Sequence, residues 1–120
     1  MAKWYAGTKA ELVSANWCVP EFACALSIKQ HTGQLDAQQA KAAWERFERL
    51  VASDLKLLPV EPVNFRRAAV LTLDAASALR AGDALHLACA EHAQAKSVAT
   101  LDAAMARNAQ RLKIKPVAFA

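Results

Sequence analysis

The 120-residue chain lacks several features that mark particular protein classes. No apolar run approaches the roughly twenty residues that a membrane-spanning helix needs, so no membrane role is expected. The first residues, MAKWYAGTKAE, have neither the apolar core nor the cleavage site of a secretory signal, which favours a cytoplasmic protein. The few glycines form neither GxGxxG nor GxxxxGK followed by Ser or Thr, so the common phosphate-binding loops are excluded.

Cysteine is also scarce. Cys18, Cys24 and Cys89 are odd in number, no pair has CxxC spacing, and Cys24 and Cys89 lie in apolar helical runs. We therefore expect three reduced thiols that pack in the interior of a cytoplasmic protein.

The residues that are present indicate one globular domain over residues 1–120. A hydrophobic content of 55% with 22% charged residues is enough for a core that needs no metal or disulfide. The formal net charge of +4 is compatible with an anionic partner such as nucleic acid. A solvated basic surface explains it equally well, because Lys and Arg are scattered along the chain.

Periodicity and end signals predict alternating strands and helices. Pro20 suits the first turn of a helix that stops at Gly33, and Asp36 with Gln39 forms a capping-box pattern. Residues 4–7 have the pattern of the last turn of a helix. The predicted strands are 11–15, 56–60, 97–101 and 114–119, and the predicted helices are 19–33, 37–53, 63–79, 79–90 and 103–112. This order predicts an α/β layer fold with a parallel sheet.

The stretch LRAGDALHLACA, residues 79–90, is almost wholly apolar after its Gly-Asp pair and must be buried. Asp83 lies in its first turn, where unpaired N–H groups and the positive end of the helix dipole favour an ionised acid. Asp83 is therefore either a helix cap or part of a site.

Two further acids occupy comparable positions. Glu21 follows the strand predicted at 11–15, and Asp102 ends the strand predicted at 97–101. Ligand sites of parallel sheets lie at the carboxyl ends of the strands, so the three acids are placed to form one pocket. Clustered carboxylates suit Mg²⁺ or Mn²⁺, which could activate water and stabilise charge on a phosphodiester. Alternatively, each acid simply stabilises the start of a helix.

At these residues the sequence resembles the PIN domain family, in particular the VapC-type toxins of bacterial toxin–antitoxin pairs. The resemblance rests on three motifs in matching order and spacing, and it covers the chain from about Glu11 onward. The motifs are LVSANWCVPEFACAL, which carries Glu21; LRAGDALHLACA, which carries Asp83; and VATLDAAMARNAQRL, which carries Thr100 and Asp102.

The resemblance implies a three-layer α/β/α fold, an acidic pocket that holds Mg²⁺ or Mn²⁺, and cleavage of RNA. It also implies homodimers and inhibition by a cognate antitoxin whose C-terminal segment lies across the pocket. By matching position, Glu21 and Asp83 would bind the metal and Asp102 would complete the acidic cluster. Thr100 would support the cluster by hydrogen bonding, and Ser14 is a weaker supporting candidate.

One departure from the family pattern affects both fold and activity. The family begins with a central apolar strand that ends in Asp followed by Thr or Ser, and no such strand occurs here. We therefore expect a domain without its N-terminal strand and most of the next helix, with impaired metal affinity and an exposed sheet interior that favours association. Glu11 lies at the wrong end of its strand to replace the missing acid.

Two functional hypotheses follow. The first is a metal-dependent endoribonuclease of the toxin type, impaired by truncation. The second is an inactive remnant that still binds an antitoxin or dimerises. An interaction domain of unrelated function is a third and more distant reading.

Several other residues have structural as well as functional interpretations. His86 is expected to pack against helices or face an antitoxin, because a His–Asp pair without further His or Cys does not form a zinc site. Trp4, Trp17 and Trp44 could stack on bases, but aromatic residues at element boundaries more often anchor a core or an interface.

Overall fold

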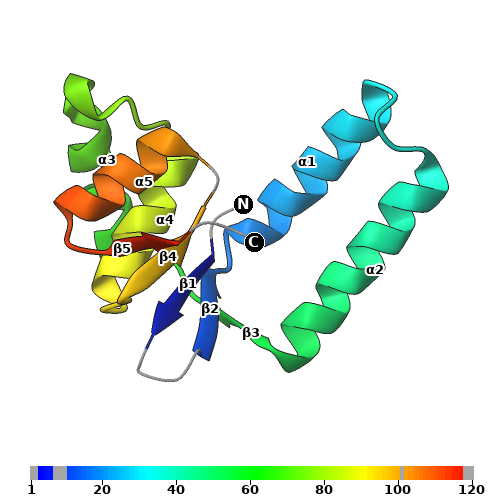
Figure 1. Cartoon of the computed structure of the whole chain (residues 1–120), viewed down its shortest axis with the longest axis horizontal. Helices are drawn as coiled ribbons and strands as arrows, with labels where there is room; N and C mark the ends of the chain where they lie inside the picture. Colours follow the sequence, from blue (N-terminus) through cyan, green and yellow to red (C-terminus); the bar gives the residue numbers. More distant parts are fainter. Residues whose placement is uncertain (1–2, 7–10, 101, 118–120) are drawn as a thin grey trace.

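The computed structural model describes residues 3–6, 11–100 and 102–117 of the chain. Two strands precede a pair of helices, and single strands then separate the later groups of helices to the end of the described residues (Figure 1). The strands are β1 (Lys3–Ala6), β2 (Glu11–Ala15), β3 (Leu55–Leu58), β4 (Ser97–Ala99) and β5 (Lys115–Val117). The helices are α1 (Cys18–His31), α2 (Ala37–Ser53), α3 (Pro62–Leu73), the 3₁₀ helix η1 (Ala75–Ser77), α4 (Ala81–His92) and α5 (Ala103–Arg111).

The predicted helix ends are mostly confirmed. The Asp36 carboxylate accepts a hydrogen bond from the Gln39 backbone N–H at 2.7 Å, and the Gln39 side chain accepts one from the Asp36 N–H at 2.9 Å. Pro62 begins α3, and Gly33, with φ +81°, follows the end of α1. These local signals are sufficient to locate the helix ends, because each depends only on residues within one helical turn.

Other boundaries differ from the prediction. The helix predicted over 63–79 ends at Leu73, because the Asp74 carboxylate accepts a hydrogen bond from the Ala76 N–H at 3.1 Å and starts η1 instead. The strands predicted at 56–60, 97–101 and 114–119 are shorter, as the ranges of β3, β4 and β5 show. Gly7, Leu101 and Phe119, which belonged to predicted elements, lie outside the described residues.

The prediction that residues 4–7 end a helix is wrong for the part that is described, because Lys3–Ala6 is the central strand of the sheet. The strand order is β3-β2-β1-β4-β5, and β1 pairs antiparallel with both β2 and β4. Only four residues separate β1 from β2, and a connection this short joins antiparallel strands, whereas parallel strands need a crossover of a dozen or more residues. The sheet is therefore mixed, and the parallel pairing predicted from the sequence holds for β2 with β3 and for β4 with β5.

The direction of β1 decides which of its residues lie near the candidate pocket. Lys3 pairs with Ala99 at the end of β4, whereas Ala6 pairs with Glu11 at the start of β2. The expected gap in the middle of the sheet is absent from the described residues, since β1 occupies that place. Its residues Lys3–Ala6 nevertheless contain no acid, so this strand brings no carboxylate to the carboxyl edge of β2 and β4.

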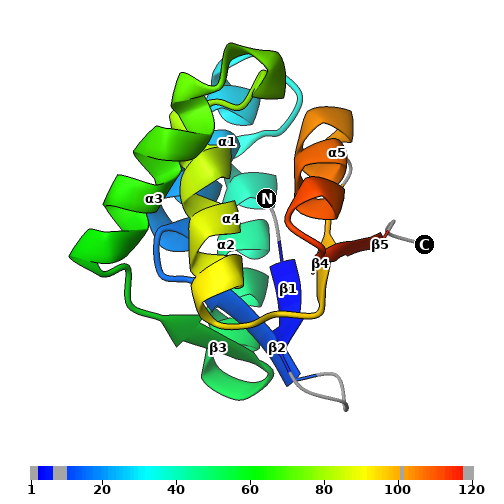
Figure 2. The same cartoon turned by 90° about the vertical axis from the view of Figure 1, so that its left-hand side faces the viewer.

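Helices cover both faces of the sheet and give three layers (Figures 1 and 2). On one face, Val13 and Val98 pack with Leu87 of α4 and with Met105 of α5 in the largest buried cluster. α3 lies against α4 and packs Ala68 onto it, outside that cluster. The apolar helix read from the sequence is the centre of this layer, because residues 84–90 are all buried.

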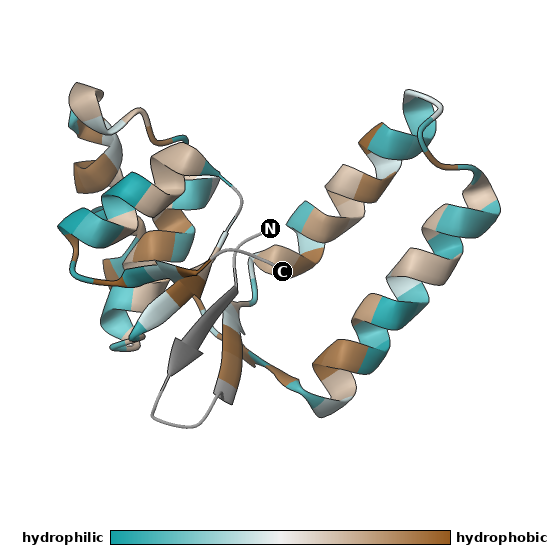
Figure 3. Cartoon of the chain, in the orientation of Figure 1, coloured by the Kyte–Doolittle hydropathy of each residue, from teal (hydrophilic) through white to brown (hydrophobic). Residues whose placement is uncertain are grey.

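The hairpin of α1 and α2 forms the other helical layer. Its aromatic residues pack together, with the ring centroids of Phe22 and Phe47 4.7 Å apart and those of Trp44 and Phe47 5.4 Å apart. They join Leu12 of β2 and Leu55 of β3 in a buried cluster. Figure 3 shows hydrophobic residues on β2 and on the end of α2 next to β3, where this contact is made.

The three cysteines do not share one environment. Cys18 and Cys89 are buried, as expected, but Cys24 is exposed on α1, so its assignment to the interior is wrong. Burial raises the pKa of the Cys89 thiol to about 11. The apolar run around Cys24 did not place it in the core because the hairpin of α1 and α2 exposes one side of α1.

A proline at position 5 tests the central place of β1. Proline cannot donate to a strand ladder and leaves a buried carbonyl unpaired, which costs about 1–3 kcal/mol. Tyr5→Pro should therefore lower the free energy of unfolding by at least about that amount in urea titrations followed by circular dichroism. Tyr5→Val, which suits a strand, is the matched control. Equal stability of the two variants would contradict a central β1.

Candidate active site

The three acids singled out in the sequence lie at helix starts near one edge of the sheet. Glu21 is in the first turn of α1, Asp83 is in the first turn of α4, and Asp102 is the N-cap residue of α5. β2 and β4 both run antiparallel to β1, so their carboxyl ends share one edge, where α1 and α5 begin. The positive ends of the helix dipoles favour ionised acids there.

Electrostatics indicate that Asp83 lies within the influence of the other two carboxylates. Burial raises the pKa of Asp83, and the negative charges of Asp102 and Glu21 raise it further. The structure thus brings together three acids that are 62 and 19 residues apart in the chain, from 21 to 83 and from 83 to 102. Their mutual repulsion is unfavourable unless a proton or a cation offsets it.

A hydrogen bond between His86 and Glu21 joins α4 to α1. The His86 side chain is 1% exposed, and its Nε2–H donates to Glu21 Oε1. Burial alone would raise the pKa of the Glu21 carboxyl, but the hydrogen bond and the electrostatic attraction of His86 hold that pKa below its ordinary value. His86 Nδ1 is buried and has no hydrogen-bond partner among the described residues.

Trp17 and Gly82 complete the surroundings of Glu21. The Trp17 indole lies near the Glu21 side chain and also lowers the pKa of its carboxyl. A Cβ atom added to Gly82 would lie 2.7 Å from Glu21 Oε2 and 3.5 Å from Trp17 Nε1. Glycine at position 82 therefore leaves room for the Glu21 carboxylate, which a larger residue there would displace.

The supporting residues proposed from the sequence lie near the strand ends. The Thr100 hydroxyl accepts a hydrogen bond from the Asp102 N–H at 3.0 Å, so it orients the backbone of Asp102. The Asp102 carboxylate itself accepts a hydrogen bond from the Met105 N–H at 2.9 Å. Ser14 is fully buried in β2, and its hydroxyl donates to the Ala15 carbonyl at 3.4 Å.

The donor set fits Mg²⁺ or Mn²⁺ in type and charge. All three candidates supply hard carboxylate oxygens, and the repulsion that raises the pKa of Asp83 is what a cation would relieve. The described side chains do not form a closed cage: none of their His, Cys, Asp and Glu groups gathers three members close enough to hold an ion. One oxygen of Glu21 is bonded to His86 and one of Asp102 caps α5.

Comparison with known proteins identifies the family. The PIN domain family model matches residues 2–111, which is nearly the whole chain. The chain belongs to the PIN domain family. Membership indicates a nuclease-type function, and PIN nucleases bind RNA. Searches of curated proteins and of solved structures find no match to this PIN domain.

The match begins nine residues before Glu11, where the resemblance was expected to start. This PIN domain has the α/β/α layers expected of the family, while the acid of the family's first strand has no counterpart in Lys3–Ala6. No helix within the described ranges is long and apolar enough to span a membrane, as the sequence predicted.

Three contributors to the site were not recognised from the sequence. The expectation that His86 packs against helices is confirmed, and the alternative that it faces a partner is wrong, since it is almost fully buried. The sequence did contain a signal for His86: a polar side chain in an apolar helix that must be buried needs a hydrogen-bond partner in the interior. Gly82 was a second signal: glycine destabilises a helix relative to alanine, so its presence there indicated that another group lies close to the helix backbone. No sequence signal linked Trp17 to Glu21.

Replacing Asp83 by Asn should stabilise this PIN domain near neutral pH when metal is chelated. Because the pKa of Asp83 is raised in the folded state, ionisation costs more there than in the unfolded chain, and this penalty applies above the folded-state pKa. It disappears as the pH falls below about 3, where the carboxyl is protonated in both states. Thermal unfolding in EDTA should therefore give Asp83→Asn a higher Tm than the wild type at pH 7 and an equal Tm near pH 3.

The control for this prediction is Asp54→Asn, at an exposed position at the end of α2. A Tm of Asp83→Asn below that of the wild type at pH 7 would contradict the prediction and would identify Asp83 as a stabilising helix-terminal acid.

Proposed function

We propose that this PIN domain is a metal-dependent endoribonuclease of the VapC toxin type, which hydrolyses phosphodiester bonds of RNA. The single observation that carries the proposal is the position of Asp83 near Glu21 and Asp102, where burial and the charges of these two acids raise the pKa of Asp83. Buried or mutually repelling acids at the carboxyl edge of a sheet reduce stability, and they are typical of sites that bind cations or transfer protons.

The roles of the residues follow from their surroundings. Asp83 and Glu21 would bind Mg²⁺ or Mn²⁺ and Asp102 would complete the ligand set, while Thr100 orients the Asp102 backbone. When bound, the ion supplies an activated water and offsets negative charge on the phosphodiester. His86 and Trp17 hold the Glu21 carboxylate in place and keep it ionised. Ser14 supports the end of β2 from the interior.

The same proposal includes partners. A toxin of this type would be held inactive by a cognate antitoxin across the acidic edge, and it would form a homodimer. Neither partner is needed for the chemistry of the three acids, so both are tested separately from cleavage.

A second candidate is a PIN domain that binds an antitoxin or dimerises without cutting RNA. It is favoured by the hydrogen bond that occupies one oxygen of Glu21 and by the lack of an acid in Lys3–Ala6. Both features would weaken metal binding at the edge. This candidate keeps the fold of a nuclease and loses the reaction.

Cleavage assays separate the two candidates. Purified protein is incubated with single-stranded and structured RNA in Mg²⁺, in Mn²⁺ and in EDTA. The endoribonuclease should cut only with metal, and Asp83→Asn should reduce the rate roughly 100-fold or more, as loss of a group that stabilises transition-state charge does. Asp54→Asn, which removes an acid outside the site, should cut as the wild type does.

Cleavage that is insensitive to both EDTA and Asp83→Asn would contradict the metal site. A folded protein that cuts no RNA under any of these conditions would contradict the endoribonuclease and favour the second candidate.

A further inference from the structure

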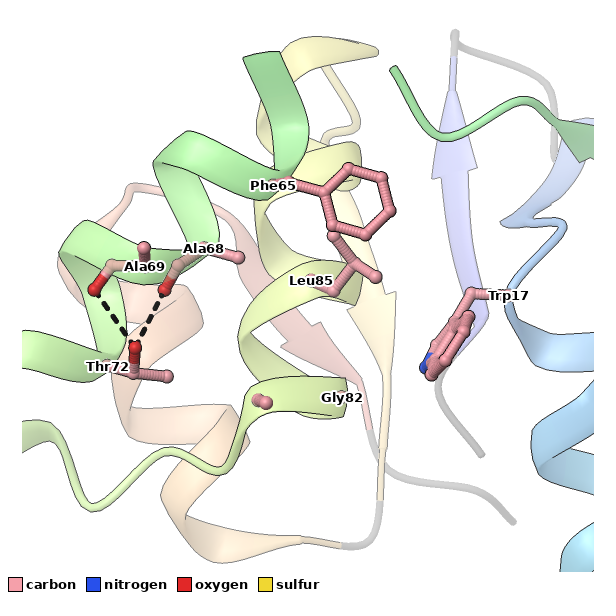
Figure 4. A pocket seen from close by; sticks show the side chains of 8 residues that line it. Trp17, Phe65, Ala68, Ala69, Thr72, Gly82 and Leu85 are labelled. Atoms are coloured by element: carbon pink, nitrogen blue, oxygen red, sulfur yellow. Dashed lines mark hydrogen bonds between the residues drawn. The ribbon is translucent and has the colours of Figure 1, made fainter. Parts of the chain in front are cut away.

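A cavity of about 370 Å³ lies beside the acidic edge, between α3, α4 and the start of α1 (Figure 4). We propose that it is a nucleobase-binding site, which holds a base of single-stranded RNA next to the phosphate at the three acids. This inference rests on the proposed function, because it names how the same site would hold its substrate. The lining residues are Trp17, Phe65, Ala68, Ala69, Thr72, Ala81, Gly82 and Leu85.

Two exposed aromatic rings form opposite walls of the cavity. Trp17 is 40% exposed and Phe65 is 53% exposed, and Figure 4 shows them on either side of the opening with Leu85 between them. Trp44, the other tryptophan whose side chain is described, packs against Phe47 instead. Trp17 is therefore the described tryptophan that offers its ring to a ligand, and stacking on such a ring is how single-stranded nucleic acids are commonly held.

The cavity adjoins Glu21 of the candidate active site. Trp17 and Gly82 line it, and these same residues contact or closely approach the carboxylate of Glu21. A nucleotide whose phosphate lies at the acids would have its base within reach of this cavity.

The chemistry of the lining favours a base over a phosphate. None of the lining residues carries a charge, and the Glu21 carboxylate, which approaches Gly82 of the lining, repels anions. A volume of about 370 Å³ falls within the range of small-ligand pockets, roughly 300–1,000 Å³. Burial of a flat, uncharged ring between Trp17 and Phe65 removes apolar surface from water without leaving a charge unpaired.

The lining also predicts weak discrimination between bases. The Thr72 hydroxyl donates to the backbone carbonyls of Ala68 at 3.2 Å and Ala69 at 2.9 Å, so its proton is already used. With few polar groups to read the edge of a base, stacking area decides the affinity. We therefore expect purines to bind more tightly than pyrimidines.

Binding measurements in EDTA test the site without cleavage. The probes are adenosine, uridine and a fluorescently labelled hexamer of oligoadenylate, followed by tryptophan fluorescence and by anisotropy. The test variants are Phe65→Ala, which removes one wall, and Ala69→Leu, which fills the cavity from an exposed position on α3. Leu73→Ala is the matched control, since Leu73 is 82% exposed on the same helix and does not line the cavity.

The wild type and Leu73→Ala should bind adenosine and the hexamer alike, with adenosine preferred to uridine. Phe65→Ala and Ala69→Leu should weaken binding roughly 5- to 150-fold, the range expected when stacking of one base is lost. Circular dichroism checks that all variants are folded, which their exposed positions favour. Equal binding by all four proteins, or no binding of either nucleoside, would overturn the proposal.

A second copy of the chain is the competing occupant. If size-exclusion chromatography shows a dimer that Phe65→Ala dissociates, and if the wild type binds no nucleoside, the cavity is an interface and the proposal is overturned. Failure of the base site is also distinguishable from failure of the nuclease. If the protein cleaves RNA and every variant binds the probes equally, only the base site is contradicted. If the variants bind as expected but no cleavage occurs in Mg²⁺ or Mn²⁺, only the catalytic assignment is contradicted.

Discussion

The hydrogen bond between His86 and Glu21 links the two helical layers of this PIN domain at the candidate active site. It holds a carboxylate of α1 against the buried helix α4, and it keeps that carboxylate ionised despite partial burial. Gly82 of α4 and Trp17 both lie close to the same carboxylate. The acidic edge and the neighbouring cavity therefore share one structural origin, which is the contact of α1 with the first turns of α4.

Charge at this edge is only partly balanced. His86 lowers the pKa of Glu21, while burial and the charges of Asp102 and Glu21 raise the pKa of Asp83 more than the attraction of His86 lowers it. Asp102 is stabilised by its own helix, because its carboxylate accepts a hydrogen bond from the Met105 N–H. A bound divalent ion would thus stabilise Asp83 more than the other two acids. Without metal, replacement of Asp83 is expected to raise the stability of the folded protein. Stability and function make opposite demands on this residue.

The central strand β1 supplies the backbone partners that its two neighbours, β2 and β4, need. A gap between β2 and β4 would leave two rows of backbone groups unpaired, which is costly in a buried sheet. Lys3–Ala6 fills that gap, but its short connection to β2 forces the antiparallel direction. β1 therefore supplies the backbone hydrogen bonds that β2 and β4 need. It supplies no carboxylate at the carboxyl edge of these strands, because Lys3–Ala6 contain no acid.

Local signals in the sequence determined most helices and strands and placed Glu21, Asp83 and Asp102 at helix starts, because capping and helical periodicity depend on residues a few positions apart. The three sequence motifs that carry these acids indicated the family. Distant pairing was beyond those signals. The four residues of β1 are too few to show a period, so only the two open neighbouring strands made them central. Likewise, the partner of His86 lies 65 residues away, and Trp17 became exposed while Trp44 became partly buried because of how the hairpin of α1 and α2 packs. Tertiary contacts alone decided these features, since they depend on which surfaces meet.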